Sequence, residues 1–212
     1  MDDEIKKFVE ADLKWADDDP PSRPEPPGKP SHGSELREWL RDIVIALIIA
    51  ILALQFIKPV IVRESSMEPN FSESDYLFAS KQSYGLLGGE PQMGDVIVFR
   101  STLKDEEDHD KLLIKRIIGV PGDVIDVTGG KVYVNEQVID DGYTKGQTTN
   151  GEIADLVVPA DSYFCLGDNR LVSVDSRSEE VGFVRKEDIV GKVVFRLFPI
   201  SEFGAIENPY EN

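Results

Sequence analysis

An uncharged apolar run near the start of the chain constrains the fold most strongly. The run IVIALIIAILALQFI, residues 43–57, contains no charge, and Gln55 is its strongly polar member. A helix of this length rises about 22 Å, which is shorter than a hydrocarbon core of about 30 Å. Arg41 and Lys58 can reach toward lipid headgroups and Trp39 suits the interface, so the usable length is greater.

We interpret residues 43–59 as a membrane anchor rather than a buried core helix or the apolar part of a cleaved leader. The run is apolar on every face, whereas a core helix at the surface of a domain is usually amphipathic. The segment QFIKPVIVRE that follows lacks the small residues typical of a cleavage site. Positive charges are nearly balanced on the two sides, so the sequence alone leaves the orientation open.

The expected anchor separates two segments of different composition. Residues 1–42 are an acidic, Pro-rich tail, and the prolines in residues 20–30 favour an extended linker. In residues 60–212, short runs of β-branched and aromatic residues alternate with turn residues, which is typical of antiparallel strands. Gly129 and Gly130 predict a hairpin between two such runs, since both accept positive φ. We therefore expect a mainly β domain after the anchor.

Composition excludes several classes of protein. The formal net charge is -17, which disfavours binding to nucleic acid phosphates. The single cysteine, Cys165, cannot form an internal disulfide or a cysteine-based zinc site. His32 and His109 lie in polar surroundings and leave little for a Ser-His-Asp triad or a metal site. We expect neither a nucleic acid partner nor a metal or organic cofactor.

Four segments of the β region are dense in residues that can carry chemistry. Lys115 lies in an apolar, strand-like run, where burial disfavours a charged amine and lowers its pKa. A neutral amine can act as a general base, and Ser66, near a proline turn, is the best candidate for a hydroxyl nucleophile. On these residues alone, a solvated edge lysine and an ordinary serine loop are simpler interpretations. The segments are SMEPN (66–70), GDVIVF (94–99), KRIIGVPGD (115–123) and GDNRLVSVDSR (167–177).

The fourth segment allows two interpretations. Its side chains can make the loop rigid through hydrogen bonds to the backbone, and Asp175 and Arg177 can form a charge-assisted pair. Its many oxygen atoms also suit calcium, but Arg170 and Arg177 would repel a dication. Elsewhere, the acidic run at residues 105–110 predicts a solvated hairpin tip on which His109 is exposed.

In this order, after an apolar span, the four segments resemble those of bacterial type I signal peptidases. The resemblance implies that Ser66 is the nucleophile and Lys115 the general base. It also implies that Ser173 hydrogen bonds to and orients the lysine amine, and that Asp175 and Arg177 form a structural salt bridge beside the site. The implied fold is an antiparallel β catalytic domain with a barrel-like core, preceded by one N-terminal transmembrane helix, as in the single-span Gram-positive form.

The resemblance further implies a serine endopeptidase that removes signal peptides from secreted precursors after small residues, at A-x-A sites. The N-terminus would be cytoplasmic and the catalytic domain extracytoplasmic. The implied partners are signal peptides, the lipid bilayer and the secretion translocon. An extended substrate would pair beside residues 62–66 and 112–115. Val62, Met67 and Ile114 are the candidates for the walls of its shallow pockets.

Two residues depart from the family pattern. Asn70 stands where Thr is usual, at a position that we expect to be structural. Glu64 stands two residues before Ser66, where many relatives have a Ser or Gly that helps to bind the oxyanion. An ionised carboxylate cannot donate a hydrogen bond and would repel that oxyanion, so we expect the Glu64 side chain to turn outward.

Two other functions stay open at this point. Glu64 allows a catalytically inactive, membrane-tethered binding module of the same fold. A self-cleaving repressor-type Ser/Lys protease shares the chemistry and part of the fold. Such repressors are soluble and carry a DNA-binding domain, so the apolar run and the acidic tail argue against this alternative.

Overall fold

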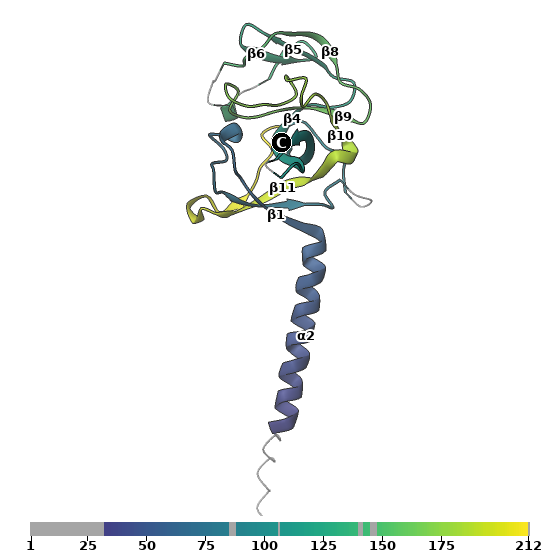
Figure 1. Ribbon diagram of the computed structural model, residues 1–212, viewed down its shortest axis with the longest axis vertical. Coiled ribbons are helices and arrows are strands. Elements are labelled where there is room, and N and C mark those ends of the chain that lie inside the picture. Colours follow the sequence, from purple (N-terminus) through teal and green to yellow (C-terminus); the bar gives the residue numbers. More distant parts are fainter. Residues whose placement is uncertain (1–31, 85–87, 106, 140–141, 145–147, 212) are drawn as a thin grey trace, which may run out of the picture. The chain divides into compact units, whose positions relative to one another are not determined.

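The structure is a computed structural model, shown as a ribbon in Figure 1. Contacts divide the chain into two units, Met1–Ile48 and Ile49–Asn212. Most of the expected tail, at residues 1–31, lies outside the described part of the chain. The described residues are 32–84, 88–105, 107–139, 142–144 and 148–211.

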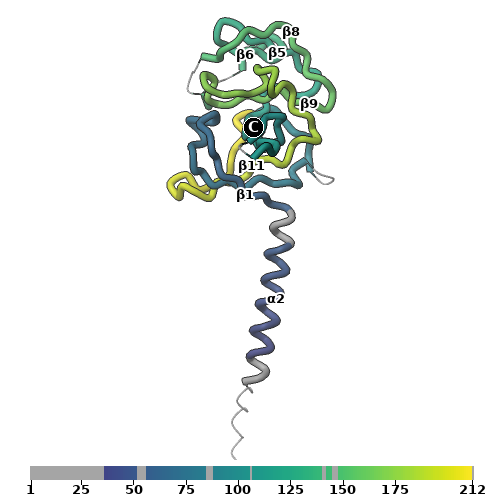
Figure 2. The backbone as a smooth tube through the Cα atoms, viewed as in Figure 1, coloured from purple at the N-terminus to yellow at the C-terminus, as the bar shows by residue number. Residues whose placement is uncertain are grey.

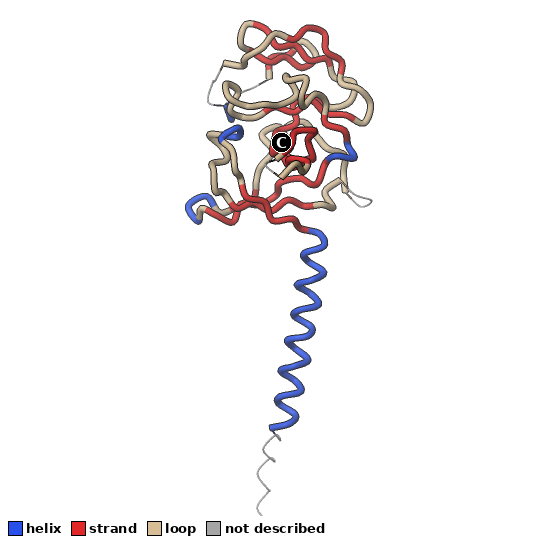
Figure 3. The backbone as a smooth tube through the Cα atoms, viewed as in Figure 1, coloured by secondary structure: helices blue, strands red, loops and turns tan. Residues whose placement is uncertain are grey.

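Helix α2 runs from His32 to Phe56 and contains most of the expected anchor (Figure 3). It begins before the apolar run because the preceding Glu, Leu and Arg residues are good helix formers. It ends at Phe56 because Pro59 lacks an N–H and disfavours helical backbone at Lys58. The helix therefore stops short of the boundary expected at residue 59. None of the helices in the described ranges is long and apolar enough to cross a membrane.

Antiparallel strands dominate the unit that follows, which confirms the expected mainly β class (Figure 1). The larger sheet has the order β1-β2-β11-β3-β4-β9-β10, and β12 pairs with β11. Its strands are Ile57–Ile61 (β1), Tyr76–Ser80 (β2), Val96–Lys104 (β3), Asp110–Gly119 (β4), Ser162–Leu166 (β9), Val184–Arg185 (β10), Ile189–Phe198 (β11) and Gly204–Ala205 (β12).

A smaller sheet with the order β7-β6-β5-β8 lies at the opposite end of this unit from β1 (Figure 1). The expected hairpin joins β5 to β6, where Gly129 and Gly130 have φ of 57° and 79°. The strands are Val124–Thr128 (β5), Lys131–Val134 (β6), Gln137–Val138 (β7) and Ile153–Val157 (β8).

The barrel-like core that we expected is not a closed barrel. In the described part of the chain, the strand pairing of the larger sheet is an open path that starts at β1 and ends at β10. β1 pairs with β2 alone, and β10 pairs with β9 over two residues. Pairing this short at one end leaves too little backbone to join the two edges.

Strand β3 is buried on both faces and joins two hydrophobic clusters. Val96 and Val98 belong to one cluster, and Ile97 and Phe99 belong to another, because successive strand residues point to opposite faces. This explains why GDVIVF is a continuous apolar run instead of an alternating one. In Figure 2, the blue segment with β1 and the yellow segment with β11 lie at the same end of this unit.

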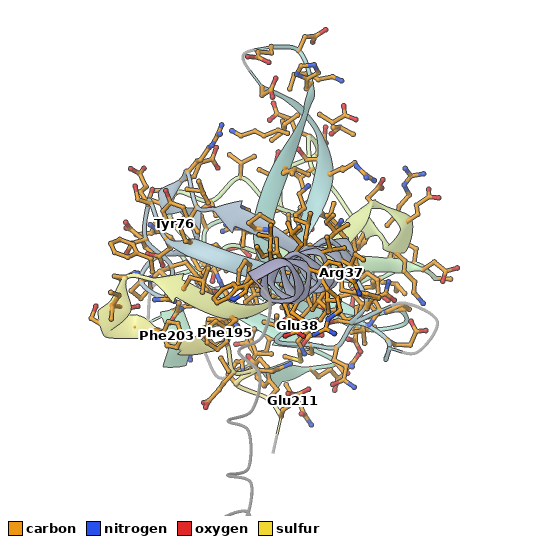
Figure 4. All side chains as sticks on the ribbon, turned by 90° about the horizontal axis from the view of Figure 1, so that it is seen from below. Arg37, Glu38, Tyr76, Phe195, Phe203 and Glu211 are labelled. Carbon is orange, nitrogen blue, oxygen red and sulfur yellow. The ribbon has the colours of Figure 1, made fainter. Side chains whose placement is uncertain are left out.

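Aromatic pairs brace the end of β11. Tyr76 and Phe198 form an edge-to-face pair with ring centroids 6.2 Å apart, and Phe195 and Phe203 form another at 4.9 Å. Figure 4 labels Tyr76, Phe195 and Phe203. Such pairs contribute about 0.5–1.5 kcal/mol beyond their buried area. They fix the short helix η4, Ile200–Glu202, against β11.

The hairpin of β3 and β4 carries the acidic run at its tip. The His109 side chain is 71% exposed there, as expected. Lys104 and Asp110 pair across the stem at 2.6 Å. This contact joins two solvated side chains and contributes little to stability. The importance of the hairpin lies further along β4, which leads from the tip to Lys115.

Candidate active site

The structure brings Ser66 and Lys115 into direct contact. Ser66 lies in the short helix η1, Ser65–Met67, and Lys115 lies in β4. The Lys115 Nζ atom donates a hydrogen bond of 2.7 Å to Ser66 Oγ, across 49 positions of sequence. Lys115 is 1% exposed and Ser66 is 8% exposed. The two residues that the sequence singled out therefore form one buried polar contact.

Burial lowers the pKa of the Lys115 amine below its ordinary value, because a desolvated ammonium loses its hydration. The carboxylates of Asp175 and Glu64 oppose part of this shift. The balance favours the neutral amine at a lower pH than for a lysine in water. An uncharged amine within hydrogen-bond distance of a hydroxyl can accept its proton.

Arg116, the next residue along β4, points to the opposite face and fixes the strand. Its Nε and Nη2 atoms donate to the two carboxylate oxygens of Asp168 at 2.9 and 2.7 Å. Its Nη1 atom donates to the Gly94 carbonyl at 2.9 Å, which ties in the start of GDVIVF. Both ends of the ion pair are buried, so removing one partner would leave an unpaired buried charge.

Asn70 joins this ion pair to the serine turn. Its side-chain amide donates to Asp168 Oδ2 at 2.8 Å and to the Tyr143 carbonyl at 2.7 Å. A threonine hydroxyl has a single proton to donate, whereas the amide donates twice. The departure from the family pattern at Asn70 therefore has a structural explanation, in line with the role expected for that position.

The loop 167–177 holds the serine turn from the other side. The backbone N–H of Asn169 donates to the Ser66 carbonyl at 3.0 Å, and its side-chain amide donates to the Ser65 carbonyl at 3.1 Å. Both bonds fix the backbone that carries the hydroxyl. Sequence reasoning named this loop but missed Asn169, although an Asn beside a Gly-Asp pair is a typical turn signal.

Asp175 and Arg177 form the ion pair that the resemblance implies. The guanidinium donates to both carboxylate oxygens at 2.8 Å, and Asp175 is fully buried. Asp175 also accepts a hydrogen bond from the backbone N–H of Gly167 at 3.0 Å. Arg177 Nη1 donates to the Arg170 carbonyl at 2.8 Å. The pair thereby ties the two ends of the loop together.

The implied hydrogen bond between Ser173 and the Lys115 amine is absent, so that expectation is wrong. The Ser173 hydroxyl is buried and has no hydrogen-bond partner within the described ranges. It packs against Gly167 instead: a Cβ placed on Gly167 would lie 2.2 Å from Ser173 Oγ and 2.4 Å from the Ser66 carbonyl oxygen. The absence of a side chain at Gly167 is what lets the loop approach the serine turn.

A groove with a volume of about 450 Å³ opens onto Ser66. One wall is formed by residues 58–64 and the other by residues 110–114. Val62, Met67 and Ile114, the candidates for substrate pockets, all line it. Val62 and Met67 are almost fully buried, so their apolar side chains lie under the surface of the groove instead of projecting into it.

Glu64 turns outward, as expected, and pairs with Lys111. The Glu64 side chain is 45% exposed and the Lys111 side chain is 37% exposed. The ion pair links the two walls of the groove, since Glu64 precedes the serine turn and Lys111 lies on β4. Sequence reasoning missed Lys111. Its spacing of four from Lys115 on a strand was the available signal, because such residues share a face.

Comparison with known proteins identifies the family. Residues 36–198 match the family described as signal peptidase, peptidase S26. A signal peptidase I of Leptolyngbya laminosa is 32% identical over 194 residues, which cover 90% of this chain and 93% of that protein. Signal peptidase IB of Staphylococcus aureus (strain Mu50 / ATCC 700699) is 34% identical and covers 82% of this chain and 96% of its own. A crystal structure of a signal peptidase I from Enterococcus faecalis V583 has 28% identity and a TM-score of 0.41, and covers 49% of this chain and 97% of that one.

The protein is a hydrolase, a serine-type endopeptidase. The extent of the family match and the identity to these relatives show that the chain belongs to the signal peptidase family, peptidase S26.

We expect Gly167→Ala to reduce peptidase activity strongly. The added Cβ would overlap the Ser173 hydroxyl and the Ser66 carbonyl, so the backbone must shift there and disturb the contact between Ser66 and Lys115. Displacements of about 1 Å at a reacting group can reduce rates about 100-fold. Gly204→Ala is the matched control, because a Cβ there meets no atom within 4 Å. Equal activities of the two variants with a precursor substrate would contradict this account.

Proposed function

We propose that this protein removes signal peptides from secreted precursors with a Ser66–Lys115 dyad, while anchored in a membrane. The family membership supports the substrate class. The observation that carries the dyad is the 2.7 Å contact between a serine hydroxyl and a lysine amine that are both buried.

The proposed reaction begins with Lys115 as the neutral amine. The Ser66 hydroxyl gives its proton to Nζ while Oγ attacks the carbonyl carbon of the scissile bond. Collapse of the tetrahedral intermediate breaks the C–N bond, and the lysine ammonium returns the proton to the leaving amine. Lys115 then takes a proton from water while the water oxygen attacks the acyl carbon. Collapse of this second intermediate breaks the ester C–Oγ bond, and the ammonium returns the proton to Oγ, which regenerates Ser66 and the neutral amine. The low exposure of the amine supports this role, because burial makes the neutral form accessible.

The loop 167–177 is the proposed support of the dyad. Asp175 and Arg177 keep the loop closed, and Ser173 packs on Gly167 beneath the serine turn. Their role is to hold the Ser66 backbone in place. The Ser66 backbone N–H is our candidate for the main donor to the oxyanion, since Glu64 cannot donate when ionised.

Substrate binding is proposed to occur by strand addition at the groove. β4 pairs with β9 from Arg116 onward, so residues 111–115 have a backbone edge that no described strand occupies. The edge of β1 opposite β2 is likewise unoccupied by any described strand. An extended precursor can hydrogen bond there, with alternate side chains directed at Val62, Met67 and Ile114. Shallow pockets of this kind favour alanine, as in A-x-A sites.

The membrane-anchored arrangement is also a proposal. Helix α2 exposes large apolar side chains over its middle, for example Leu47 and Ile49 at 58% and 61%. Apolar surface of this extent needs a partner, and a lipid bilayer is the one that we propose for residues 43–59. The N-terminus would be cytoplasmic and the catalytic domain extracytoplasmic, near the secretion translocon that delivers precursors.

The exposed position of Glu64 favours the enzyme over the inactive binding module. That alternative rested on repulsion between the Glu64 carboxylate and a developing oxyanion. The carboxylate points outward and its charge is balanced by Lys111. The repressor-type alternative gains no support from the described residues.

We expect Ser66→Ala and Lys115→Ala each to reduce kcat at least about 10³-fold, since each removes one half of the proposed dyad. The measurement is cleavage of a precursor with an A-x-A site in detergent. Ser72→Ala and Lys186→Ala are matched controls, because both side chains lie away from the groove lining. Cleavage by either dyad variant at the control rate would refute the dyad.

We expect a precursor with Phe in place of the Ala before the cleaved bond to lose about tenfold or more in kcat/KM, because the groove base is already filled by Val62 and Met67. Phe at the middle position of A-x-A is the control, since alternate side chains of a strand point away from the pocket. Similar losses for the two precursors would argue against pocket selection.

We expect the full chain to stay in membranes under alkaline carbonate extraction. The double substitution Ile45→Arg and Ile49→Arg should release the chain from the membrane, because each charge at the centre of a bilayer helix costs about 2.5–3.5 kcal/mol. Arg37→Gln, outside the apolar run, is the control. Extraction of the unaltered protein by salt alone would overturn the anchor.

A further inference from the structure

Two lysines of β4 contact side chains in residues 64–66, on the other side of the groove. Lys115 reaches Ser66, and Lys111 reaches Glu64. The lysines are four residues apart on one strand and so project from the same face. Their partners are two residues apart. The outer contact therefore lies beside the proposed reacting pair, at the exposed rim of the groove.

The charged and titratable groups around the Lys115 amine come from four segments of the chain: the loop after β9, β9 itself, the residues before η1, and β4. Asp175, from the loop after β9, forms an ion pair with Arg177 and still raises the pKa of Lys115. Cys165, from β9, is buried, which raises the pKa of its thiol and keeps it uncharged at neutral pH. Glu64 and Lys111 act on the amine with opposite signs: the carboxylate raises the pKa of Lys115 and the ammonium lowers it.

We propose that Lys111 is a positioning residue that cancels the charge of Glu64 beside the dyad, so that neither the general base nor the developing oxyanion meets a net negative charge. This proposal rests on the proposed function of Ser66 and Lys115. It explains how the chain carries a carboxylate two residues before its nucleophile. It also gives the Glu64–Lys111 ion pair a role in the electrostatics of the site, in addition to its place in the groove lining.

The pH dependence of kcat/KM tests the proposal, because two single variants must move it in opposite directions. In Lys111→Met, the unpaired carboxylate favours the protonated amine, so the acid limb should move to higher pH. In Glu64→Gln, the unpaired ammonium disfavours the protonated amine, so the acid limb should move to lower pH. In the double variant, both charges are gone and the acid limb should return toward that of the unaltered protein.

The kcat on the plateau provides a second readout. Lys111→Met should lower it, since the negative charge of Glu64, two residues before Ser66, is then uncompensated while the oxyanion develops. Adding Glu64→Gln to Lys111→Met should restore it, and Lys111→Arg, which keeps the charge, should preserve both kcat and the acid limb. Raising the salt concentration should shrink the differences between variants, because both side chains are partly exposed and are screened.

A matched control is available far along the chain. Glu90 and Lys186 form another Glu–Lys ion pair, in which the lysine is 35% exposed, against 37% for Lys111. Neither residue is among the groups with the largest effects on the pKa of the Lys115 amine. Glu90→Gln and Lys186→Met should leave the acid limb in place.

The outcomes separate this proposal from the proposed function. If Ser66→Ala still cleaves, the dyad itself fails and the proposal falls with it. If Ser66→Ala is inactive but Glu64→Gln and Lys111→Met shift the acid limb in the same direction, or leave it unmoved, the dyad stands and the proposal is overturned. Failure of the double variant to recover the kcat lost in Lys111→Met would overturn it as well.

Discussion

The contact between a desolvated amine and a hydroxyl is the constraint on which the rest of the site depends. A lysine on β4 stays buried only if the fold supplies the energy to remove it from water. Here the hydrophobic clusters on both faces of β3 and β4 supply it. The same burial lowers the pKa of Lys115, so packing and chemical reactivity have one cause.

The other polar contacts of the site hold Lys115 and Ser66 in position. Arg116 with Asp168 fixes β4, while Asn70 links Asp168 to the segment that follows the serine turn. Asn169 holds the carbonyls of Ser65 and Ser66 from the opposite side. Each partner is a charged group or an amide with little freedom, and buried hydrogen bonds of this kind define a single geometry. The amine and the hydroxyl themselves make few other side-chain contacts.

The sequence predicted those features that depend on local patterns. Alternating and continuous apolar runs predicted most strands, and Gly129-Gly130 predicted its hairpin because φ is a local property. The apolar neighbours of Lys115 allowed a buried amine but left a solvated edge lysine as the simpler interpretation, because burial depends on what packs over the strand. The partners of Glu64 and Asn70 depend on which strands meet. The spacing of Lys111 from Lys115 indicates a shared face but not the contact with Glu64, and no local pattern pairs Asp168 with Asn70. The barrel-like core and the hydrogen bond from Ser173 came from the resemblance; the larger sheet is an open path of strands, and the Ser173 hydroxyl lies against Gly167 instead of the Lys115 amine.

The unoccupied backbone edges beside the groove have a consequence for aggregation. An edge open to one extended peptide is also open to a strand from another copy, and such pairing leads to aggregates. The edge strand β1 carries Lys58 and Pro59, and the corresponding part of β4 begins with Asp110 and Lys111. A proline and charges interrupt long ladders but tolerate a few bonds. Binding of a short extended peptide at these edges is thus compatible with resistance to aggregation between copies of the chain.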